Sequence, residues 1–561
     1  MDHRASLSKF RLKKGFLPLA GVCAGLSVSS AAFAFQIDSG NPDFRISWDN
    51  TVKYSAAWRV RDVDSNVADS STNGPQVNTN DGDQNFDRGL ISNRLDLLSE
   101  FDLRYKRNYG LRLSGAAWYD DVYNKSNDNP GALGGALVNS RGVDYDEFTD
   151  DTEKLHGRKA ELLDAFVYGS FTPGDMNLNA KAGRFTQLYG ESLFFGSNGI
   201  AAAQTSLDLI KALSVPNSQF KEILRPIGQV SGQLQINSNV SIGAYYQLEW
   251  RKSRLPGAGS YFSFADFVDE GGDSLILGPG FSVLRGDDIE ARDSGQGGVQ
   301  VKFKAGDTEY GIYAAQFHDK MPQFYVYPTS GLYEQVYAED IRTIGFSFST
   351  LVGETNVAGE LSFRDDMPLV ATGNAVILPM GIGSADGGDH SAFPKGRTMH
   401  LNLSAISVLA ATPFWDGASF IGEFAFNRRL SVTDEGDTTP GTGNGLDPEA
   451  TRDAGALQFV FTPEYFQVAP GLDLQVPIGV SYGLFGSSSV NGALFPANHG
   501  GNVSVGLKAE YQKTWQASVG ITHYYGPDGS VIKYGTARPE LSYDNFHGDR
   551  DFISMSIQRT F

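Results

Sequence analysis

The stretch from Phe44 to Arg61 restricts the possible fold more than any other part of the sequence. Apolar side chains occupy almost every second position, from Phe44 through Trp48 to Trp58, and polar or charged side chains fill the positions between them. Successive side chains of a β-strand point to opposite faces, so this stretch predicts a long strand with one apolar and one charged face. The pattern recurs to the last residue, and repeated long strands of this kind are typical of an outer-membrane β-barrel.

The first 34 residues have the features of a secretory signal. Five basic residues between Arg4 and Lys14 precede an apolar run from Phe16 to Val28, and the small-residue site Ala32-Phe33-Ala34 follows. The run is shorter than the roughly 20 residues that a membrane-spanning helix needs, so we expect cleavage near Ala34. The single cysteine, Cys23, lies within this signal, so the mature chain would form no disulfide and no thiolate metal site.

Residues 35–561 show an even strand pattern without a linker, which predicts one all-β domain, a transmembrane antiparallel β-barrel. Short turns such as Pro173-Gly174-Asp175 alternate with long loops and give about 18 strands, with 16 as the nearest alternative count. In bacterial barrels the short turns face the periplasm and the long loops face outward. The net charge of −19 argues against a nucleic-acid partner, because phosphate binding needs clustered Lys and Arg.

One loop, at about residues 188–225, is unusually apolar. Because such side chains are costly to leave in water, we expect the loop to fold inward and narrow the lumen. The alternative is packing on neighbouring loops above the rim. Ser206 is placed to cap a short helix that Pro216 ends, with Asp208 in its first turn. The residues expected to form the constriction are Leu193, Phe194, Phe195, Ile200, Leu207, Leu209, Ile210 and Leu213.

Charged residues on the predicted inward faces form a second candidate site. They can set ion selectivity, or they can pair across strands and stiffen the wall. The strand expected from Val240 to Arg251 directs Trp250 outward and its charged neighbours inward. The candidates are Arg59, Arg61, Arg94, Glu100, Asp102, Arg104, Arg112, Asp164, Arg184, Glu249 and Arg251.

The stretch that surrounds the apolar loop resembles a known family. Its motifs are Gly183-Arg184-Phe185-Thr186-Gln187-Leu188-Tyr189-Gly190-Glu191-Ser192, Gly199, Leu207-Asp208, Phe220-Lys221-Glu222, Leu224-Arg225-Pro226 and Tyr246-Gln247-Leu248-Glu249-Trp250. They are similar to the proteobacterial outer-membrane family labelled domain of unknown function 1302, over nearly the whole mature chain. The resemblance implies a barrel of the Gram-negative outer membrane, often associated with uptake or export of lipids, sterols or hydrocarbons.

Three further loops carry apolar residues. They are Phe262, Phe264 and Phe267, then Phe324 to Tyr327, then Leu369-Val370 with Val376 to Met380. These residues can form a hydrophobic mouth that collects an apolar substrate, or they can form small cores inside the loops themselves. The sequence favours neither arrangement.

Other chemistries have weaker signals. An acidic run from Asp144 to Glu153, together with Asp81-Gly82-Asp83, can bind calcium or bridge lipopolysaccharide through divalent ions, or it is simply a solvated loop. The histidines lack zinc-site spacing, so we predict no metal and no other cofactor. Gly272-Asp273-Ser274-Leu275 and Asp544 with His547 match two short esterase signatures. That esterase family needs an α/β domain, so we predict no enzyme, and a surface esterase is a remote alternative.

The sequence therefore predicts an outer-membrane channel or transporter that passes small, mainly hydrophobic molecules. The principal alternative is a general or ion-selective porin. Expected partners are outer-membrane lipid and lipopolysaccharide, a small-molecule substrate, and a transport protein of the periplasm or inner membrane. The last strand, which ends in the aromatic residue Phe561, is expected to be read by the barrel-assembly machinery.

Overall fold

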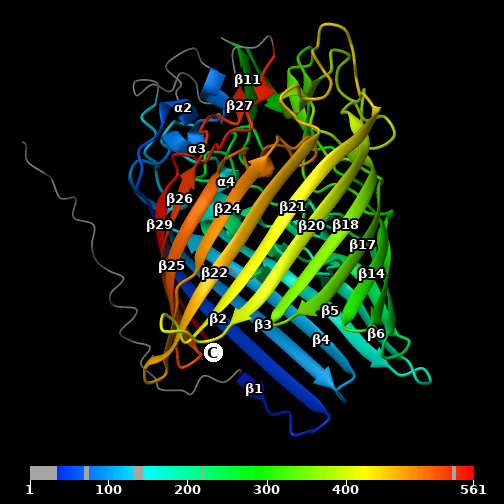
Figure 1. Cartoon of the computed structure of the whole chain (residues 1–561). Helices are drawn as coiled ribbons and strands as arrows, with labels where there is room; N and C mark the ends of the chain where they lie inside the picture. Colours follow the sequence, from blue (N-terminus) through cyan, green and yellow to red (C-terminus); the bar gives the residue numbers. More distant parts are fainter. Residues whose placement is uncertain (1–34, 69–74, 132–142, 217–219, 279–280, 534–537) are drawn as a thin grey trace, which may run out of the picture. The chain divides into compact units, whose positions relative to one another are not determined.

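A computed structural model describes residues 35–68, 75–131, 143–216, 220–278, 281–533 and 538–561. Its main sheet contains 20 strands, in antiparallel order around a closed ring. Two of them add nothing to the circumference. β1 (Phe35–Ile37) pairs only with β2, and β23 (Leu472–Gln475) lies between the same two neighbours as β24, so 20 − 2 = 18 strands form the wall. Figure 1 shows these tilted strands.

Each strand of the wall pairs with its neighbours in sequence. The last strand pairs with the first, from Thr51↔Thr560 to Arg59↔Phe552, which closes the barrel. The predicted 18-stranded antiparallel barrel is therefore confirmed. The wall strands are β2 (Phe44–Arg59), β3 (Gly89–Tyr105), β4 (Tyr109–Asp120), β5 (Arg158–Phe171), β6 (Asn177–Phe185), β9 (Ile227–Gln235), β10 (Val240–Gln247), β13 (Gln296–Ala305), β14 (Thr308–Phe317), β17 (Ile341–Val352), β18 (Thr355–Pro368), β20 (Lys395–Leu409), β21 (Gly417–Asp434), β22 (Asp453–Ala469), β24 (Ile478–Phe485), β25 (Gly501–Tyr511), β26 (Trp515–Tyr525) and β29 (Phe552–Thr560).

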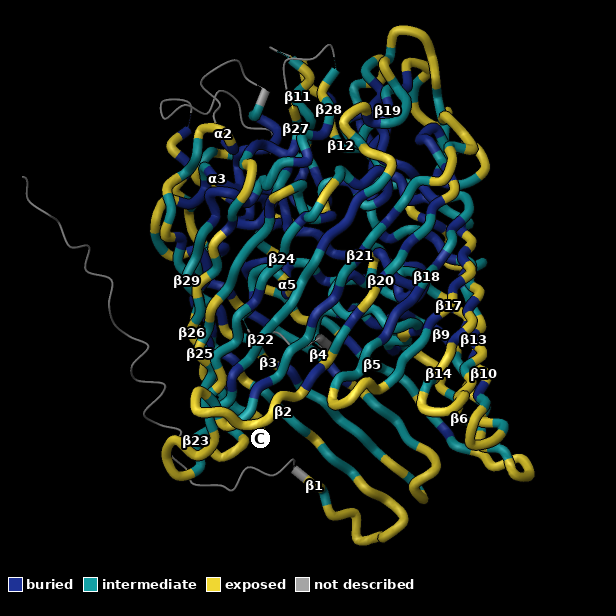
Figure 2. Tube along the Cα trace, in the orientation of Figure 1, coloured by how far each residue is buried: buried dark blue, intermediate teal, exposed yellow. Residues whose placement is uncertain are grey.

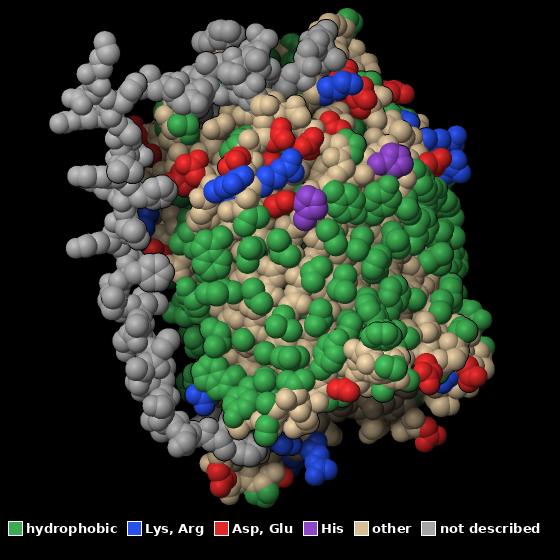
Figure 3. Space-filling model, turned by 60° about the vertical axis from the view of Figure 1, so that its left-hand side comes forward, with side chains coloured by type: hydrophobic (Ala, Val, Ile, Leu, Met, Phe, Trp, Pro, Cys, Tyr) green, Lys and Arg blue, Asp and Glu red, His purple; other side chains and the backbone are tan. Residues whose placement is uncertain are grey.

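The outer face of the wall is apolar. Outward residues such as Val52 and Leu97 lie opposite each other on paired strands and are exposed. Figure 3 shows that hydrophobic side chains cover the middle of one face, with charged side chains above and below them. Aromatic pairs, among them Phe44–Tyr105 and Tyr109–Phe171, lie at the short-turn end. An apolar band edged by aromatic side chains is the surface that a barrel presents to a bilayer.

Short turns connect the strands at one end, and long loops gather at the other (Figure 1). Gly174, Gly306 and Gly353 adopt positive φ values of 63°, 63° and 62° in these turns, a conformation that glycine adopts without strain. The loops contain a five-stranded sheet of β11 (Ser274–Gly278), β12 (Phe281–Arg285), β15 (Gln323–Tyr327), β16 (Leu332–Val336) and β19 (Ala375–Ile377), and a pair formed by β27 (Ile532–Lys533) and β28 (Glu540–Leu541).

Figure 2 shows that much of this loop region is buried. Phe324, Tyr325 and Leu369 lie in hydrophobic clusters between loops, and Phe262 lies in another such cluster. These four residues therefore belong to the cores of the loops, the second of the two arrangements left open by the sequence, whereas Met380 is 85% exposed. The loops form a folded cap over the barrel.

The helices of the described residues are short. They are α2 (Ser65–Ala68), α3 (Asp81–Gln84), α4 (Asp150–Thr152), α5 (Leu209–Ser214) and α6 (Phe220–Ile223), with a π-helical turn at Glu153–Gly157 and 3-10 turns at Pro75–Asn78, Val122–Asn124, Ile200–Ala203, Thr372–Asn374 and Gly492–Leu494. In the part of the chain that the structure describes, no helix has the length and apolar character needed to cross a membrane.

The strand expected from Val240 to Arg251 ends earlier, at Gln247. Trp250 does not face outward as predicted. Its backbone N–H donates to Asp293, its indole N–H donates to the Asp319 carbonyl, and its ring packs on Tyr337. Polar partners in the neighbouring loops thus hold Trp250 three residues after the strand has ended.

Candidate functional site in the barrel lumen

Residues 186–226, here called the inner segment, connect β6 to β9 and include β7 (Ser206–Leu207), α5, α6 and β8 (Leu224–Arg225). The predicted helix exists, but its cap differs from the prediction. Asp208 is the N-cap, because its carboxylate accepts the Lys211 backbone N–H, and Ser206 belongs to β7 instead. The helix ends at Ser214, before Pro216. Residues 217–219 lie outside the described residues.

The first part of the inner segment is bound to Glu423 of β21. One carboxylate oxygen, Oε2, accepts the backbone N–H groups of Leu193, Phe194 and Phe195, and Oε1 accepts the Asn402 amide at 2.7 Å. Glu423 is 1% exposed. β6 is the fifth and β21 the thirteenth strand of the ring, so this contact joins nearly opposite sides of the barrel. One side chain thus satisfies three buried backbone donors at once, which makes Glu423 an effective anchor.

Glu360 of β18 forms a second anchor. Its two carboxylate oxygens accept the backbone N–H groups of Glu191 at 2.6 Å and Ile200 at 2.9 Å. Gly190 and Gly199 approach the same carboxylate so closely that a Cβ atom at either position would collide with it. Gly190 also has a φ of +93°, a left-handed conformation that favours glycine. Both glycines are thus required by the close approach of the segment to Glu360.

Asn198 fixes the turn between these two anchors. Its amide nitrogen donates to Asn402 Oδ1 at 2.9 Å, and its amide oxygen contacts His400 Nδ1 at 3.1 Å. The Arg364 guanidinium donates to the carbonyls of Ser197 and Gly199 at 3.0 and 2.8 Å. Side chains of β18, β20 and β21 therefore satisfy donors and acceptors of an irregular backbone that lies away from water.

Aromatic side chains support the segment on the next part of the wall. Tyr189 packs against Tyr245 of β10 and Tyr313 of β14, with ring centroids 5.3 and 6.1 Å apart, and Ile200 completes the cluster. Gln204 donates to the Tyr245 hydroxyl at 3.1 Å. The contacts of the inner segment thus extend along the wall from β10 to β21.

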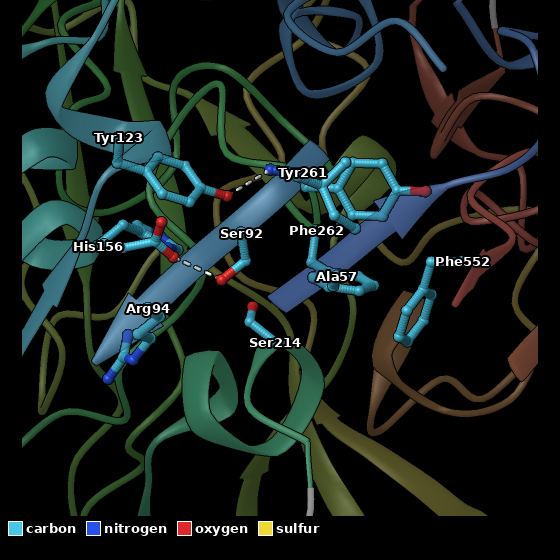
Figure 4. A pocket seen from close by; sticks show the side chains of 11 residues that line it. Ala57, Ser92, Arg94, Tyr123, His156, Ser214, Tyr261, Phe262 and Phe552 are labelled. Atoms are coloured by element: carbon cyan, nitrogen blue, oxygen red, sulfur yellow. Dashed lines mark hydrogen bonds between the residues drawn. The ribbon is translucent and has the colours of Figure 1, made fainter. Parts of the chain in front are cut away.

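The second part of the segment turns back toward β2, β4 and β5. Lys211 of α5 forms an ion pair with Glu161 at 3.5 Å and lies over the Trp118 ring. Lys53 of β2 donates to the Pro216 carbonyl at 3.4 Å. Figure 4 shows Ser214 at the end of α5, pointing toward β2 and β3 across a cavity of about 10 Å³, the size of one water molecule. The helix therefore packs closely on this side of the wall.

The apolar candidates of the segment divide into two groups. Phe195, Ile200 and Ile210 are buried, and Phe195 packs against Ala425, Ala454, Ala456 and Phe495. The partly exposed residues are Leu193, Phe194, Leu207, Leu209 and Leu213. Because the segment contacts inward-facing side chains, these five residues add apolar surface inside the barrel.

The charged candidates are held in pairs. Arg112 contacts Glu100 and lies 3.4 Å from Asp164, so β3, β4 and β5 bring three of them together. The other contacts are Arg94–Asp96 at 2.7 Å, Arg104–Asp102 at 3.0 Å, Arg184–Glu249 at 2.6 Å, Arg61–Asp64 at 3.3 Å, Arg59–Asp549 at 3.0 Å and Arg251 to the Pro226 carbonyl at 3.0 Å. Among these contacts, those of Arg112 join neighbouring strands of the wall, whereas the Arg94 and Arg104 pairs lie within β3. A role of the candidates in ion selectivity stays a prediction.

Arg59 belongs to the cap rather than to the open lumen. It lies beside Asp83 and Asp549 near Arg550, and all four side chains are buried. Burial and the neighbouring Asp83 raise the pKa of Asp549 to about 7, whereas Arg550 holds the pKa of Asp83 below its usual value despite burial. Since Asp83 pairs with Arg550 at 2.7 Å, its carboxylate is engaged by a cation of the chain itself.

The esterase signature residues occupy different surroundings. His547 Nε2 lies 3.2 Å from the Phe262 carbonyl, and the ring packs among Phe262, Tyr524 and Phe546. Burial lowers the pKa of His547 to about 3. Ser274 begins β11, in the sheet of the loops. His547 thus directs its Nε2 at a backbone carbonyl, where a general base would need to face the serine hydroxyl.

The anchors Glu360, Glu423 and Asn198 were absent from the residues selected by sequence. A usable signal existed, because both glutamates alternate with outward apolar residues, Leu361 and Phe363 on β18 and Phe424 and Phe426 on β21. Period two assigns such a carboxylate to the lumen. The alternation does not show which backbone N–H groups will donate to the carboxylate there.

The closed ring, the apolar band and the anchored inner segment define a transmembrane β-barrel with a structured lumen. The chain belongs to the family described as protein of unknown function (DUF1302), whose model matches residues 15–561. The family resemblance found in the sequence is therefore confirmed. None of the curated proteins compared with the chain matches it.

Several solved structures are similar to this chain. OccAB3 of Acinetobacter baumannii is 10% identical, covers 92% of this chain and 99% of its own, and has a TM-score of 0.40. OccAB1 of the same organism is 10% identical over 92% and 96%, with a TM-score of 0.42. The outer membrane protein OpdK of Pseudomonas aeruginosa is 10% identical over 92% and 98%, with a TM-score of 0.40. Similarity at this level defines no function for this chain.

Proposed function

We propose that the protein is an outer-membrane channel for small, mainly hydrophobic molecules, and that the inner segment sets its bore. The observation that carries the proposal is the attachment of this segment to Glu360 and Glu423, across the ring from β6. An empty 18-stranded barrel would be roughly 35 Å wide between backbones and would pass solutes with little discrimination. A segment fixed inside such a barrel narrows it to a selective passage.

The apolar character of the segment supports a hydrophobic substrate. Leu188 is exposed, and Leu193, Phe194 and Leu213 are partly exposed, on a segment that contacts the inward face of the wall. The pairing of the charged candidates also supports a hydrophobic rather than an ionic substrate, because paired charges attract free ions weakly. A general porin would instead need a wide and polar passage. Transport would be passive, because the proposal requires no energy-coupling group.

The location and the partners belong to the same proposal. Residues 1–34, the predicted signal, lie outside the described residues. β29 ends at Thr560, directly before the terminal Phe561, and supports recognition by the barrel-assembly machinery. Arg342 and Arg397 are exposed at the loop end of the outer face, each in an ion pair, with Asp366 and Asp365. We propose that the phosphates of lipopolysaccharide compete with these carboxylates for the two guanidinium groups. A transport protein of the periplasm or inner membrane would meet the short-turn end.

Single-channel conductance tests the proposal. Mature protein would be refolded into a planar bilayer, with and without residues 193–215 replaced by a short Gly-Ser linker. The proposal expects a small conductance for the intact chain and a large steady pore for the replacement. Equal conductance of the two proteins would contradict the constriction. Uptake into liposomes of neutral solutes of equal size and increasing hydrophobicity tests the substrate class, and the proposal expects uptake to rise with hydrophobicity in the intact chain only.

A further inference from the structure

The hairpin formed by β1 and β2 lies at the short-turn end of the barrel, and its tip is exposed (Figure 2). On the side away from β3, β2 pairs with β29 from Arg59 to Thr51 and with β1 from Trp48 to Ile46. β1 has no second strand partner among the residues that the structure describes. The hairpin therefore has a free strand edge at the end of the barrel that the proposed function places in the periplasm.

A cavity of about 1270 Å³ lies against this hairpin. Residues 36–45 line it, together with Arg104, Lys106 and Arg107. Four of the lining residues are basic and two are acidic, which leaves a surplus of two positive charges, whereas the whole chain has a net charge of −19. The volume exceeds the roughly 300–1000 Å³ of a small-molecule pocket, so the cavity has room for a segment of a protein.

Arg45 of β2 lies directly opposite Arg104 of β3 in the register of the two strands. Arg104 has a partner, because its Nε donates to Asp102 at 3.0 Å. Arg45 is exposed and forms no ion pair and no side-chain hydrogen bond with the part of the chain that the structure describes. Like charges directly opposite each other on paired strands repel, so the two arginines favour the approach of an anion.

The turn between β3 and β4 adds two more cations. Lys106 Nζ lies 4.0 Å from Asp43, and the Lys106 backbone N–H donates to the Asp43 carbonyl at 2.8 Å, which joins the turn to the hairpin. Arg107 is exposed and, within the described residues, has no ion pair and no side-chain hydrogen bond. Other short turns carry acidic residues instead, namely Asp175, Asp307, Glu354 and Asp416. Two adjacent basic residues are thus a particular feature of this turn.

Membrane lipid is a poor match for this cavity. On the outward face at the same level, Phe44 packs on Tyr105 with ring centroids 4.8 Å apart. Arg45 and Arg104 alternate with these residues and occupy the opposite, inward face of the sheet. Both arginines line the cavity, whereas Tyr105 does not. The ligand should therefore come from the periplasm and not from the surrounding bilayer.

We propose that this cavity is the docking site for an extended acidic segment of a periplasmic protein. Carboxylates of the segment pair with Arg45 and Arg107, whose guanidinium groups donate charge-assisted hydrogen bonds to such acceptors. Gln36 and Ile37 of β1 line the same cavity, so the free strand edge offers backbone groups to an extended chain. This inference rests on the proposed channel function and deepens it, since it gives the expected transport protein a binding site and a chemical character.

A synthetic peptide of four Glu-Thr repeats is the probe for this site, and a peptide of four Lys-Thr repeats is its basic counterpart. Fluorescence anisotropy of the labelled peptides measures their affinity for the full mature barrel in detergent. We expect the acidic peptide to bind at least about tenfold more tightly than the basic peptide, as one charge-assisted contact implies. Its affinity should fall as the salt concentration is raised, because the contacts are exposed.

The double variant Arg45→Glu with Arg107→Glu should lose at least about tenfold in affinity for the acidic peptide. It should retain its fold, since neither side chain has a partner among the described residues. Lys304→Glu is the matched control, because Lys304 is also exposed and lies beside a short turn, at the end of β13. Its affinity for the acidic peptide should equal that of the wild type.

Equal affinity of the wild type for both peptides, or an unchanged affinity in the double variant, would overturn the inference. Displacement of the acidic peptide by short-chain phosphatidylglycerol, but not by phosphatidylcholine, would identify lipid as the occupant and would overturn it as well. The measurement is independent of conductance. A barrel that binds the acidic peptide but lacks the constriction would therefore refute only the proposed channel function, and a selective channel that does not bind the peptide would refute only the docking site.

Discussion

Two parts of the lumen wall are built on the same alternation and differ in what their inward side chains hold. On the anchoring wall, formed by β18, β20 and β21, Glu360 and Glu423 are buried and accept backbone N–H groups of the inner segment. On the lysine wall, formed by β25, β26 and β29, Lys508 and Ser518 are half-buried, and Lys508 has no partner among the described residues.

The difference shows how a barrel can combine a fixed constriction with a passage. An irregular segment inside a barrel must satisfy its backbone donors, and carboxylates do this for several N–H groups at once. On the lysine wall, small hydroxyl side chains such as Ser518 leave space for a solute, and the charge of Lys508 is not neutralised by a partner among the described residues. The anchoring wall therefore fixes the segment, and the lysine wall is where we expect the solute to move.

The largest expected effect comes from removal of an anchor. Glu423→Ala leaves three backbone N–H groups and the Asn402 amide without their acceptor. Each lost partner of a buried donor costs about 1–3 kcal/mol, so the segment should detach from β21 and conductance should rise several-fold.

The matched control is Glu510→Ala, an inward glutamate of the lysine wall whose described partner is Gln516 at 3.3 Å. Its conductance should change little. Equal effects of the two substitutions would show that the walls do not differ in the way described.

A smaller effect is expected from narrowing the passage. Ser518→Trp places a large ring on the lysine wall, in the row of Lys508, and should lower single-channel conductance by about half, because the ring occupies part of the passage that the inner segment leaves open. Val519→Trp changes the next residue, which is exposed on the outer face, and should leave conductance unchanged. A passage elsewhere in the lumen would make both variants behave like the wild type.

The smallest effect on conductance should come from a change of pH, because pH changes the stability of the cap and not the width of the passage. Burial lowers the pKa of His156 and of His547 to about 3, against an ordinary value of 6.5. The unfolded loops therefore bind more protons between these two values, so the contribution of the two histidines to cap stability is complete above pH 6.5 and falls as pH decreases toward 3. Asp549, whose pKa is raised to about 7, acts in the opposite direction, but it is one group against two.

Limited proteolysis of the loops at pH 7.5 and pH 5 measures this dependence, and cleavage should be faster at pH 5. His547→Phe should reduce the difference, while His523→Phe, a change at a half-exposed ring beside Asp551, should not. Cleavage rates independent of pH in the wild type would contradict the stated cause.

The strand pattern and the turns were predictable, because alternation and turn chemistry are local properties. The register of β2 with β3, in which Val52 lies opposite Leu97, follows from the apolar faces. The role of Glu423 was not predictable in this way, since its partners at Leu193 to Phe195 are about 230 residues distant in sequence.

Two local predictions were wrong for a related reason. Trp250 leaves the strand pattern because Asp293 and the Asp319 carbonyl lie in other loops. Asp208 replaces Ser206 as the helix cap because Ser206 donates instead to the Lys252 carbonyl at 2.8 Å. In both cases tertiary partners decide between options that the sequence leaves equal.

Thiol accessibility tests the difference between the two walls most directly. The sole cysteine, Cys23, belongs to the predicted signal, so the mature chain accepts single cysteines at Ser518 and at Ser404, which is 7% exposed and lies 3.5 Å from the Glu191 carbonyl. With a small charged thiol reagent we predict rapid modification and current loss for Ser518→Cys, and slow modification for Ser404→Cys that becomes rapid when Glu423→Ala is added. Equal rates at the two positions in the intact barrel would contradict the account.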